Sequence, residues 1–357
     1  MKLKTLRLIN FRNYSDETIS FSPHINCLYG ENAQGKTNIL EAIHLLCNGR
    51  SFRTNQLKDL IQNEKDFFRL EAKIEKNGIT HTLTQTYDLK QRTYKLNEAS
   101  IQSFSKLLNH FPAIIHTPKD TDLITGAPTL RRKLIDFQIS QSDIHYLFHL
   151  TRYYRALKQR NALLKKKTPS AIALFENEMA KASSYIIEKR NEYLKTLIPV
   201  LENIQKRLSL PFENYQIQYD TFSKNFQNIQ SEYLALLEKM RPQDEKYQAT
   251  QIGIHKDDYE FFINKQLAKN FASEGQKKSF IASLKLGLWE ALSSQIDTPI
   301  IMMIDDFNAH LDSKRLSSYF NSLNDLGQVF ITQPLPLKSS LDKIQLFHVQ
   351  KGSIKSF

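Results

Sequence analysis

The sequence predicts an α/β protein in which a mainly helical segment interrupts a sheet domain. A short apolar run at 26–29 precedes a glycine-rich loop, and from Lys36 onward apolar residues recur at helical spacing. Residues 299–331 read as strand, helix and strand, an order that indicates a parallel sheet. Between 128 and 208 apolar residues recur at helical intervals without a strong strand pattern.

The separate elements follow from local composition. The segment 79–87 is rich in β-branched residues with a period of two, which predicts a strand after the turn at 76–78. Pro128 suits a first helical turn, and the lysine-rich segment 165–170 predicts a loop between two helical stretches. Later elements are expected at 259–263 (strand), 274–294 (helix), 299–304 (strand), 313–326 (helix) and 329–331 (strand).

The 357 residues are enough for two domains, or for one large domain that carries an insertion. We expect residues 1–118 and 242–357 to form the two parts of one sheet domain. Residues 119–241 would then form a helical insertion.

Composition bounds the function. Lysine and arginine number 49 against 37 acidic residues, a net charge of +12 that favours a polyanionic partner. Cys27 and Cys47, the only cysteines, are expected in the core; two cysteines exclude a disulfide scaffold and fit a reducing cytoplasm. The longest apolar run, 300–304, is far too short to cross a bilayer, so we expect no membrane residence.

The loop after the first buried strand fits the pattern G-x-x-x-x-G-K-[ST]. Its glycines let backbone N–H groups point at phosphate oxygens, and the following helix N-terminus adds positive potential. Lys36 would reach the terminal phosphates of ATP, and the Thr37 hydroxyl would bind Mg²⁺. The alternative is a chance glycine-rich turn with a solvated lysine. The expected ATP-binding residues are Gly30, Glu31, Asn32, Ala33, Gln34, Gly35, Lys36 and Thr37.

Two acids end the apolar run at 300–304. Beside a phosphate-binding loop, Asp305 would hold the Mg²⁺ shell, and Asp306 would orient or deprotonate the attacking water. The alternative is an ordinary strand end with an acidic cap for the next helix.

A third motif, with Ser273, Gly275 and Gln276, opens the helix expected at 274–294. A serine there is usually only an N-cap. The order of phosphate loop, insertion, S-x-G-Q and acid-ended strand resembles the ATP-binding-cassette ATPases. That resemblance implies an ABC-type P-loop ATPase head, with a mixed sheet, helices and an antiparallel β portion. It also implies an ATP-dependent head-to-tail homodimer, in which the N–H groups of Ser273 and Gly275 contact the γ-phosphate held by the opposite subunit; Gln276 is counted with them among the expected nucleotide-binding residues.

Further strings narrow the resemblance to the RecF family of bacterial recombination-mediator ATPases. They extend from Phe11 to Asp306 and cover nearly the whole chain. The strings are FRNY (11–14), GRSFRT (49–54), TPKD (117–120), LITG (123–126), RRKLID (131–136), LKQRNALL (157–164) and HKDD (255–258).

The resemblance implies an ATP-dependent DNA-binding protein of recombinational repair and replication. Such a protein binds ATP and dimerises. It binds single-stranded and gapped DNA, and works with RecO and RecR to load the RecA recombinase. The implied activity is a weak, DNA-dependent ATPase that serves as a switch, with a head similar to those of chromosome-maintenance SMC ATPases.

Some positions depart from the family pattern. Ala309 and His310 stand where the family usually has Ser-Glu, and Asp306 replaces the glutamate of fast ATPases. No histidine occupies the position of the γ-phosphate sensor of transporter ATPases. The shorter Asp306 and the missing sensor histidine predict slow hydrolysis. Glu41, on the helix after the phosphate loop, is expected at the surface or in a local ion pair.

Basic residues concentrate between 131 and 167, where ten of them face only two acids. A basic helical stripe tracks phosphates, which predicts sequence-independent DNA binding; a merely solvated helix face is the alternative. Tyr146, Tyr153 and Tyr154, interleaved with the charges, are expected in the core. The candidate DNA contacts are Arg131, Arg132, Arg152, Arg155, Lys158, Arg160, Lys165, Lys166 and Lys167.

Other functions stay open on the sequence alone. The same motifs would serve the ATPase subunit of a transporter, an SMC-like structural ATPase or a nuclease-coupled ATPase. A structural DNA-binding protein with a vestigial phosphate loop is a non-enzymatic alternative.

Overall fold

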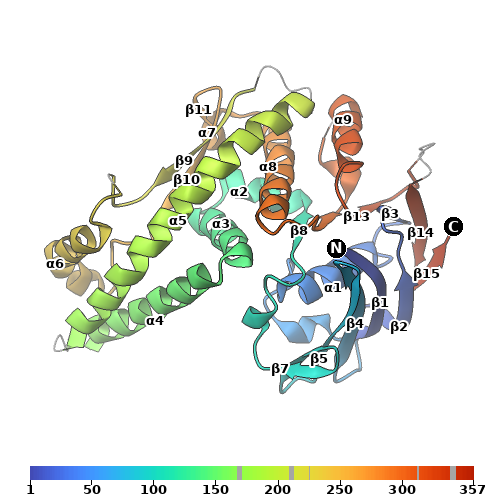
Figure 1. Cartoon of the computed structure of the whole chain (residues 1–357), viewed down its shortest axis with the longest axis horizontal. Coiled ribbons are helices and arrows are strands. Elements are labelled where there is room, and N and C mark those ends of the chain that lie inside the picture. The colour runs from blue at the N-terminus through green and yellow to red at the C-terminus, as the bar shows by residue number, and fades with distance from the viewer. Residues whose placement is uncertain (167–170, 209–212, 225, 312, 338–342) are drawn as a thin grey trace. The chain divides into compact units, whose positions relative to one another are not determined.

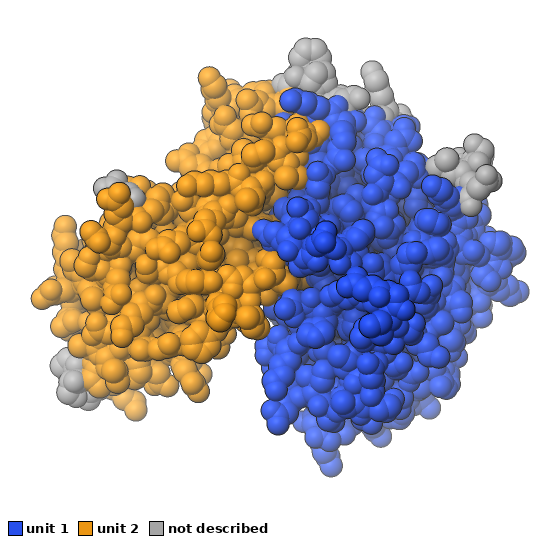
Figure 2. Space-filling view, viewed as in Figure 1, with its two compact units in different colours: residues 1–120, 204–210, 278–357 blue, residues 121–203, 211–277 orange. Residues whose placement is uncertain are grey.

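The chain forms two compact units, coloured separately in Figure 2. Unit 1 comprises Met1–Asp120, Ile204–Leu210 and Lys278–Phe357, and unit 2 comprises Thr121–Asn203 and Pro211–Lys277. Lys167 and most of the loop expected at 165–170 lie outside the described residues. The computed structural model describes residues 1–166, 171–208, 213–224, 226–311, 313–337 and 343–357.

Unit 1 contains a mostly parallel sheet in the order β15-β14-β3-β13-β12-β8. All neighbours pair in parallel except β14 and β15. All four residues of β12 are buried, which explains why that strand is apolar throughout. The parallel sheet expected from the C-terminal pattern is confirmed. The strands are β3 (Ile25–Tyr29), β8 (Ala113–His116), β12 (Ile301–Ile304), β13 (Val329–Gln333), β14 (Ile344–Gln350) and β15 (Ser353–Ser356).

A second sheet of unit 1 is antiparallel, in the order β2-β1-β4-β5-β6-β7. The strand expected at 79–87 is β5. Asn77 and Gly78, both with positive φ, form the two-residue turn from β4 into β5. The strands are β1 (Lys2–Phe11), β2 (Tyr14–Ser20), β4 (Phe68–Lys76), β5 (Ile79–Tyr87), β6 (Arg92–Leu96) and β7 (Ala99–Ile101).

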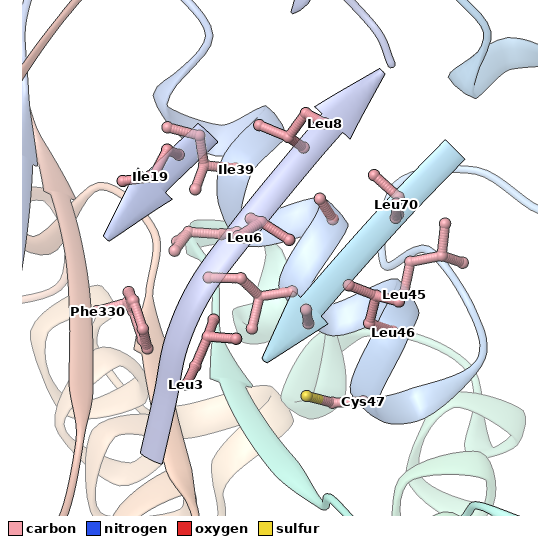
Figure 3. Packing of buried hydrophobic residues seen from close by; sticks show 14 of the residues in the cluster. Leu3, Leu6, Leu8, Ile19, Ile39, Leu45, Leu46, Cys47, Leu70 and Phe330 are labelled. Atoms are coloured by element: carbon pink, nitrogen blue, oxygen red, sulfur yellow. The ribbon is translucent and has the colours of Figure 1, made fainter. Parts of the chain in front are cut away.

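Helix α1 (Lys36–Asn48) shares one hydrophobic core with both sheets. Figure 3 brings together Leu6 of β1, Leu70 of β4, Leu45 of α1 and Phe330 of β13. This packing fixes the helix that follows the phosphate loop against the strands that carry the other motifs. The remaining elements of unit 1 are η1 (Leu57–Leu60), η2 (Phe104–Lys106), η5 (Phe307–Ala309), α9 (Ser313–Leu323) and most of α8 (Glu274–Gln295).

Unit 2 is mainly helical, with a small antiparallel sheet in the order β11-β10-β9. Figure 1 shows α4 running beside α5. No helix in the described part of the chain is both long and apolar enough to cross a membrane. After η3 (Pro118–Thr121) the elements are α2 (Asp122–Thr125), α3 (Pro128–Ser142), α4 (Ile144–Lys166), α5 (Ile172–Arg207), β9 (Tyr215–Asp220), α6 (Ile229–Tyr247), β10 (Asp258–Ile263), β11 (Gln266–Leu267) and α7 (Ala268–Phe271).

The division into units differs from the boundary expected near residue 241. Strand β9, which the sequence analysis did not identify, pairs with β10 along its whole length. This pairing holds the chain as far as Lys277 in unit 2.

Buried ion pairs join the elements of unit 2. The side chain of Arg190 is fully buried and bonds Asp136 of α3 (2.8 Å) and Asp257 (2.7 Å). Arg160 is equally buried and bonds Glu176 (2.8 Å) and Asp244 (2.7 Å). Removing one partner of such a pair leaves an uncompensated buried charge, so these contacts specify how the helices pack. The strings RRKLID and HKDD therefore have structural roles here.

Gly253 sits beside a buried polar cluster in unit 2. Its φ is +132°, and a Cβ atom there would overlap the hydroxyl oxygens of Tyr233 and Tyr153. Those hydroxyls bond each other (3.0 Å), and that of Tyr153 also bonds Nδ1 of His255 (2.7 Å).

We expect Gly253→Ala to lower the free energy of unfolding by about 3 kcal/mol, because backbone strain adds to disruption of this cluster. Gly78→Ala is the control: its φ is also positive (+78°), but nothing lies within 4 Å of the added Cβ. It should cost about 1 kcal/mol. Chemical denaturation of both variants tests this, and equal losses would contradict the account.

Candidate functional site

Three neighbouring strands of the parallel sheet bring the candidate residues together at their carboxyl ends. Strand β3 leads into the loop 30–37, β12 ends at Asp305 and Asp306, and β13, between them, ends at Gln333. A cavity of about 430 Å³ lies at this edge. Its lining includes Asn32, Lys36, Thr37, Asp305, Asp306 and Thr332. Residues separated by up to 300 positions in sequence thus share one site.

The backbone of the loop requires its glycines. Gly30 has φ +147° and Gly35 has φ +114°. A Cβ on Gly30 would overlap the carbonyl oxygen of Val349, and one on Gly35 would lie 2.6 Å from Asn13. Only glycine satisfies both the dihedral angle and the space at these positions.

Lys36 folds back into the loop at the start of α1. Its ammonium group donates to the carbonyl oxygens of Gly30 (2.5 Å) and Glu31 (2.7 Å). Burial lowers the pKa of Lys36, and the charges of Asp306 and Asp305 oppose that shift. The site therefore concentrates a partly desolvated cation next to two carboxylates.

Thr37 and the acidic pair are joined by hydroxyl groups. The Thr37 hydroxyl donates to Oδ1 of Asp305 (2.8 Å), and the Thr332 hydroxyl donates to the same oxygen (2.7 Å). Thr332 also accepts the backbone N–H of Asp306 (2.8 Å). Asp306 has φ +52°, a sparsely populated region for aspartate. Thr332 thus holds both acids in position.

Two histidines, whose rings contact each other at a tilt, bond the backbone of Asp305. His116 accepts the Asp305 N–H at its carbonyl oxygen (2.9 Å), and Nε2 of His310 bonds the Asp305 carbonyl (2.7 Å). The two imidazole centroids are 3.7 Å apart. Burial lowers the pKa of His310 to about 4, so its ring is neutral at pH 7 and donates from Nε2. His310 thereby orients the acid-bearing turn.

The strings FRNY and GRSFRT converge on α1. Glu41 is fully buried, and Arg12 bonds both of its oxygens (2.9 and 2.8 Å). Ser51 (2.5 Å) and Arg53 (3.3 Å) also donate to this carboxylate. The expectation of a surface position for Glu41 was wrong, whereas the ion pair is confirmed. Its partners come from a turn and a loop that helical periodicity cannot reveal.

The same two strings also support the loop itself. The Asn13 amide donates to the carbonyl oxygen of Gln34 (2.9 Å), and the Tyr14 hydroxyl donates to that of Gly35 (3.1 Å). Arg53 bonds Asn38 (2.7 Å) and lines the cavity. Sequence reasoning gave no role to Arg53 or Thr332. Finding them required the strand order and the path of the loop at 49–54.

Ser273 starts α8 in a reciprocal capping arrangement. Its hydroxyl accepts the Gln276 N–H (3.2 Å), and the Gln276 side chain accepts the Ser273 N–H (2.9 Å). Ser273 and Gly275 are exposed. The N-cap role is therefore present, and the helix start is open to solvent.

The candidate DNA contacts separate by exposure. Arg131 is buried and bonds Asp258 (2.8 Å), and Arg160 is buried as described above, so the expectation that these two contact DNA was wrong. Arg132 is half-buried and donates to the Asp257 carbonyl oxygen. Lys167 lies outside the described residues. The exposed candidates are Arg152, Arg155, Lys158, Lys165 and Lys166, all on α4.

The chain is similar to known proteins in sequence and in fold. Residues 1–352 match the family model of an AAA ATPase domain. The chain is 38% identical over 340 residues to the DNA replication and repair protein RecF of Protochlamydia amoebophila, covering 94% of this chain and 95% of that protein. A solved structure of the recombination mediator protein RecF with ATP superimposes with a TM-score of 0.92 at 29% identity, covering 100% of this chain and 97% of that one. An SMC head bound to the C-winged helix domain of ScpA has a TM-score of 0.57 at 17% identity, covering 100% of this chain and 97% of that one, and shows a shared fold only.

The Arg12–Glu41 pair provides a test of how α1 is held. We expect Arg12→Met to lower the free energy of unfolding by about 2 kcal/mol, because Glu41 stays buried with fewer partners. Arg7→Met is a matched control, since Arg7 on β1 forms a similar two-bond pair with Asp16 but both side chains are exposed. The control should change stability much less. Similar losses in the two variants, measured by urea denaturation, would show that burial of Glu41 is not decisive.

Proposed function

Since this chain belongs to the RecF family, we propose that it is an ATP-dependent DNA-binding protein of recombinational repair and replication. One observation carries the proposal. The phosphate-type loop, Thr37 and the acidic pair meet in one cavity, where Thr37 and Asp305 are 2.8 Å apart. That combination of a cationic loop with hard oxygen donors suits a nucleotide triphosphate.

ATP would bind with its phosphates over the loop 30–37. Backbone N–H groups at the start of α1 would face the phosphate oxygens, and Lys36 would exchange its two carbonyl contacts for the terminal phosphates. Arg53, which lines the same cavity, adds a second cation within reach. The partial desolvation of Lys36 strengthens such a contact.

Mg²⁺ fits the donor set. The Thr37 hydroxyl and the Asp305 carboxylate are hard oxygen ligands that already point at each other. Bound there, the ion would neutralise the phosphate charge. Asp306, held by Thr332, is the candidate to orient the attacking water. Its short side chain supports slow hydrolysis, as in a switch.

A second copy would complete the site. The exposed start of α8 offers Ser273, Gly275 and Gln276 as a ready anion-binding helix terminus. Two copies arranged head to tail would each place this terminus on the γ-phosphate bound by the other. ATP would then join the two subunits.

The dimer would bind single-stranded and gapped DNA through α4, whose exposed cations are Arg152, Arg155, Lys158, Lys165 and Lys166. We further propose that it acts with RecO- and RecR-type mediators to load a RecA-type recombinase. The relation to a structure of RecF in the RecFOR pathway supports this role.

We expect Lys36→Ala to weaken ATP binding at least about tenfold, because it removes the charge-assisted phosphate contact. Lys65→Ala, an exposed lysine outside the cavity, serves as the control. Calorimetric titration with ATP and Mg²⁺ measures both. If Lys36→Ala bound ATP with unchanged affinity, the nucleotide could not bind in this cavity as proposed.

Ser273→Arg should bind ATP normally but stay monomeric, since a bulky cation would block the partner's approach. Ser273→Thr keeps the N-cap and should still dimerise. Light scattering with ATP, Mg²⁺ and gapped DNA gives the mass of each species. ATP-dependent dimers of the arginine variant would argue against this interface.

A further inference from the structure

The exposed face of α4 joins apolar and basic residues in one row. Its members recur at steps of three and four positions, so they lie on one side of a helix about 33 Å long. The face begins with Ile144 and Phe148, residues that are 49% and 54% exposed. The row consists of Ile144, Phe148, Arg152, Arg155, Gln159, Ala162 and Lys166.

Phe148 is the aromatic member of this face. The Arg152 guanidinium lies 5.3 Å from its ring centroid, and the His149 ring meets it edge-on at 5.5 Å. Arg152 in turn forms an ion pair with Glu178 of α5. One side of the ring is thus covered by a cation, while about half of the side chain stays open to solvent.

The charge of α4 suits a polyanion. The helix has six basic residues and no acidic one, and only Arg160 of the six is buried. Arg155, Lys158, Lys165 and Lys166 have no ion-pair partner among the described residues. The neighbouring pairs Arg152–Glu178 and Lys189–Glu192 are exposed and cost little to open.

We propose that Phe148 is a stacking platform for an unpaired base, with the phosphates of the same strand on the cations that follow it along α4. Single-strand binding sites combine a basic track with an exposed aromatic ring in this way. Duplex DNA keeps its bases stacked internally and would use only the basic track. The inference rests on the proposed DNA binding and adds how a single strand is preferred over a duplex.

The neighbouring tyrosines do not fill this role. Tyr146 and Tyr153 are fully buried and hydrogen-bonded within unit 2. Tyr154 is 41% exposed but lies on a different side of α4 from Phe148. Of the phenylalanine and the tyrosines of α4, Phe148 is the one in the row with Arg152, Arg155 and Lys166.

The test compares three ligands of equal length, with ATP and Mg²⁺, at each of several salt concentrations: an oligothymidylate, an abasic single strand and a duplex. Phe148→Ala should bind the oligothymidylate about tenfold more weakly, the size of one lost base stack. Its binding to the abasic strand and the duplex should not change. Phe148→Trp should retain the affinity of the parent chain.

Arg155→Ala is the matched control for a phosphate contact. It should weaken all three ligands alike and lower the salt dependence of binding, which Phe148→Ala should leave unchanged. The chain has one tryptophan, the buried Trp289. In Phe148→Trp a new fluorescence signal should therefore fall on adding oligothymidylate but not the abasic strand.

Two results would overturn the inference. One is unchanged oligothymidylate binding by Phe148→Ala, which would leave the proposed function intact and point to an apolar protein partner instead. The other is a Phe148→Ala variant that binds all three ligands more weakly by the same factor. If the unaltered chain bound no DNA, the proposed function itself would fail.

Discussion

The contact between the Thr37 hydroxyl and the Asp305 carboxylate is the constraint on which the rest of the site depends. It joins the start of α1, which follows the loop after β3, to the end of β12 across 268 positions of sequence. The intervening chain includes all of unit 2, so neither motif gains its partner until the parallel sheet has assembled. Strand β13 between them supplies Thr332, whose hydroxyl bonds the Asp305 carboxylate and the Asp306 backbone N–H. Thr332 thereby holds both acids in place. The site therefore exists only because β3, β13 and β12 are neighbours in the parallel sheet.

A second set of contacts holds the phosphate loop and α1 in place at the carboxyl edge of the parallel sheet. Glu41 is buried one turn after Lys36, and its cationic partners come from the β1–β2 turn and the loop at 49–54. The antiparallel sheet thus holds the helix that presents the phosphate loop. In unit 2, Arg160 and Arg190 hold helices together in a similar manner. Because buried acids neutralise these arginines, fewer basic residues of the chain are exposed. The exposed candidates for contact with a polyanion lie on α4.

The sequence predicted what is local and missed what depends on pairing. The phosphate loop, its helix and the acid-ended strand were identifiable because each lies in a continuous segment with a specific spacing. Arg131 was misassigned because its acidic partner Asp258 lies 127 positions away, and Arg160 because one of its two acidic partners, Asp244, lies 84 positions away. Strand β9 was missed for a similar reason, because it is stabilised by pairing with β10. The boundary between the two units depends on that pairing and was missed with it. Thr332 received no role, because its contacts follow from the place of β13 between β3 and β12.

The most direct test of the account is a double-mutant cycle on Thr37 and Asp305, using Thr37→Val and Asp305→Asn, with ATP affinity measured with and without Mg²⁺. If both side chains hold one ion beside the phosphates, each substitution alone weakens ATP binding in Mg²⁺, and the double variant loses little more than either one. Without Mg²⁺ that coupling falls to what the direct hydrogen bond between Thr37 and Asp305 contributes. Additive losses in Mg²⁺, or a coupling of the same size in its absence, would show that the two groups do not share a metal at the nucleotide and would contradict the account.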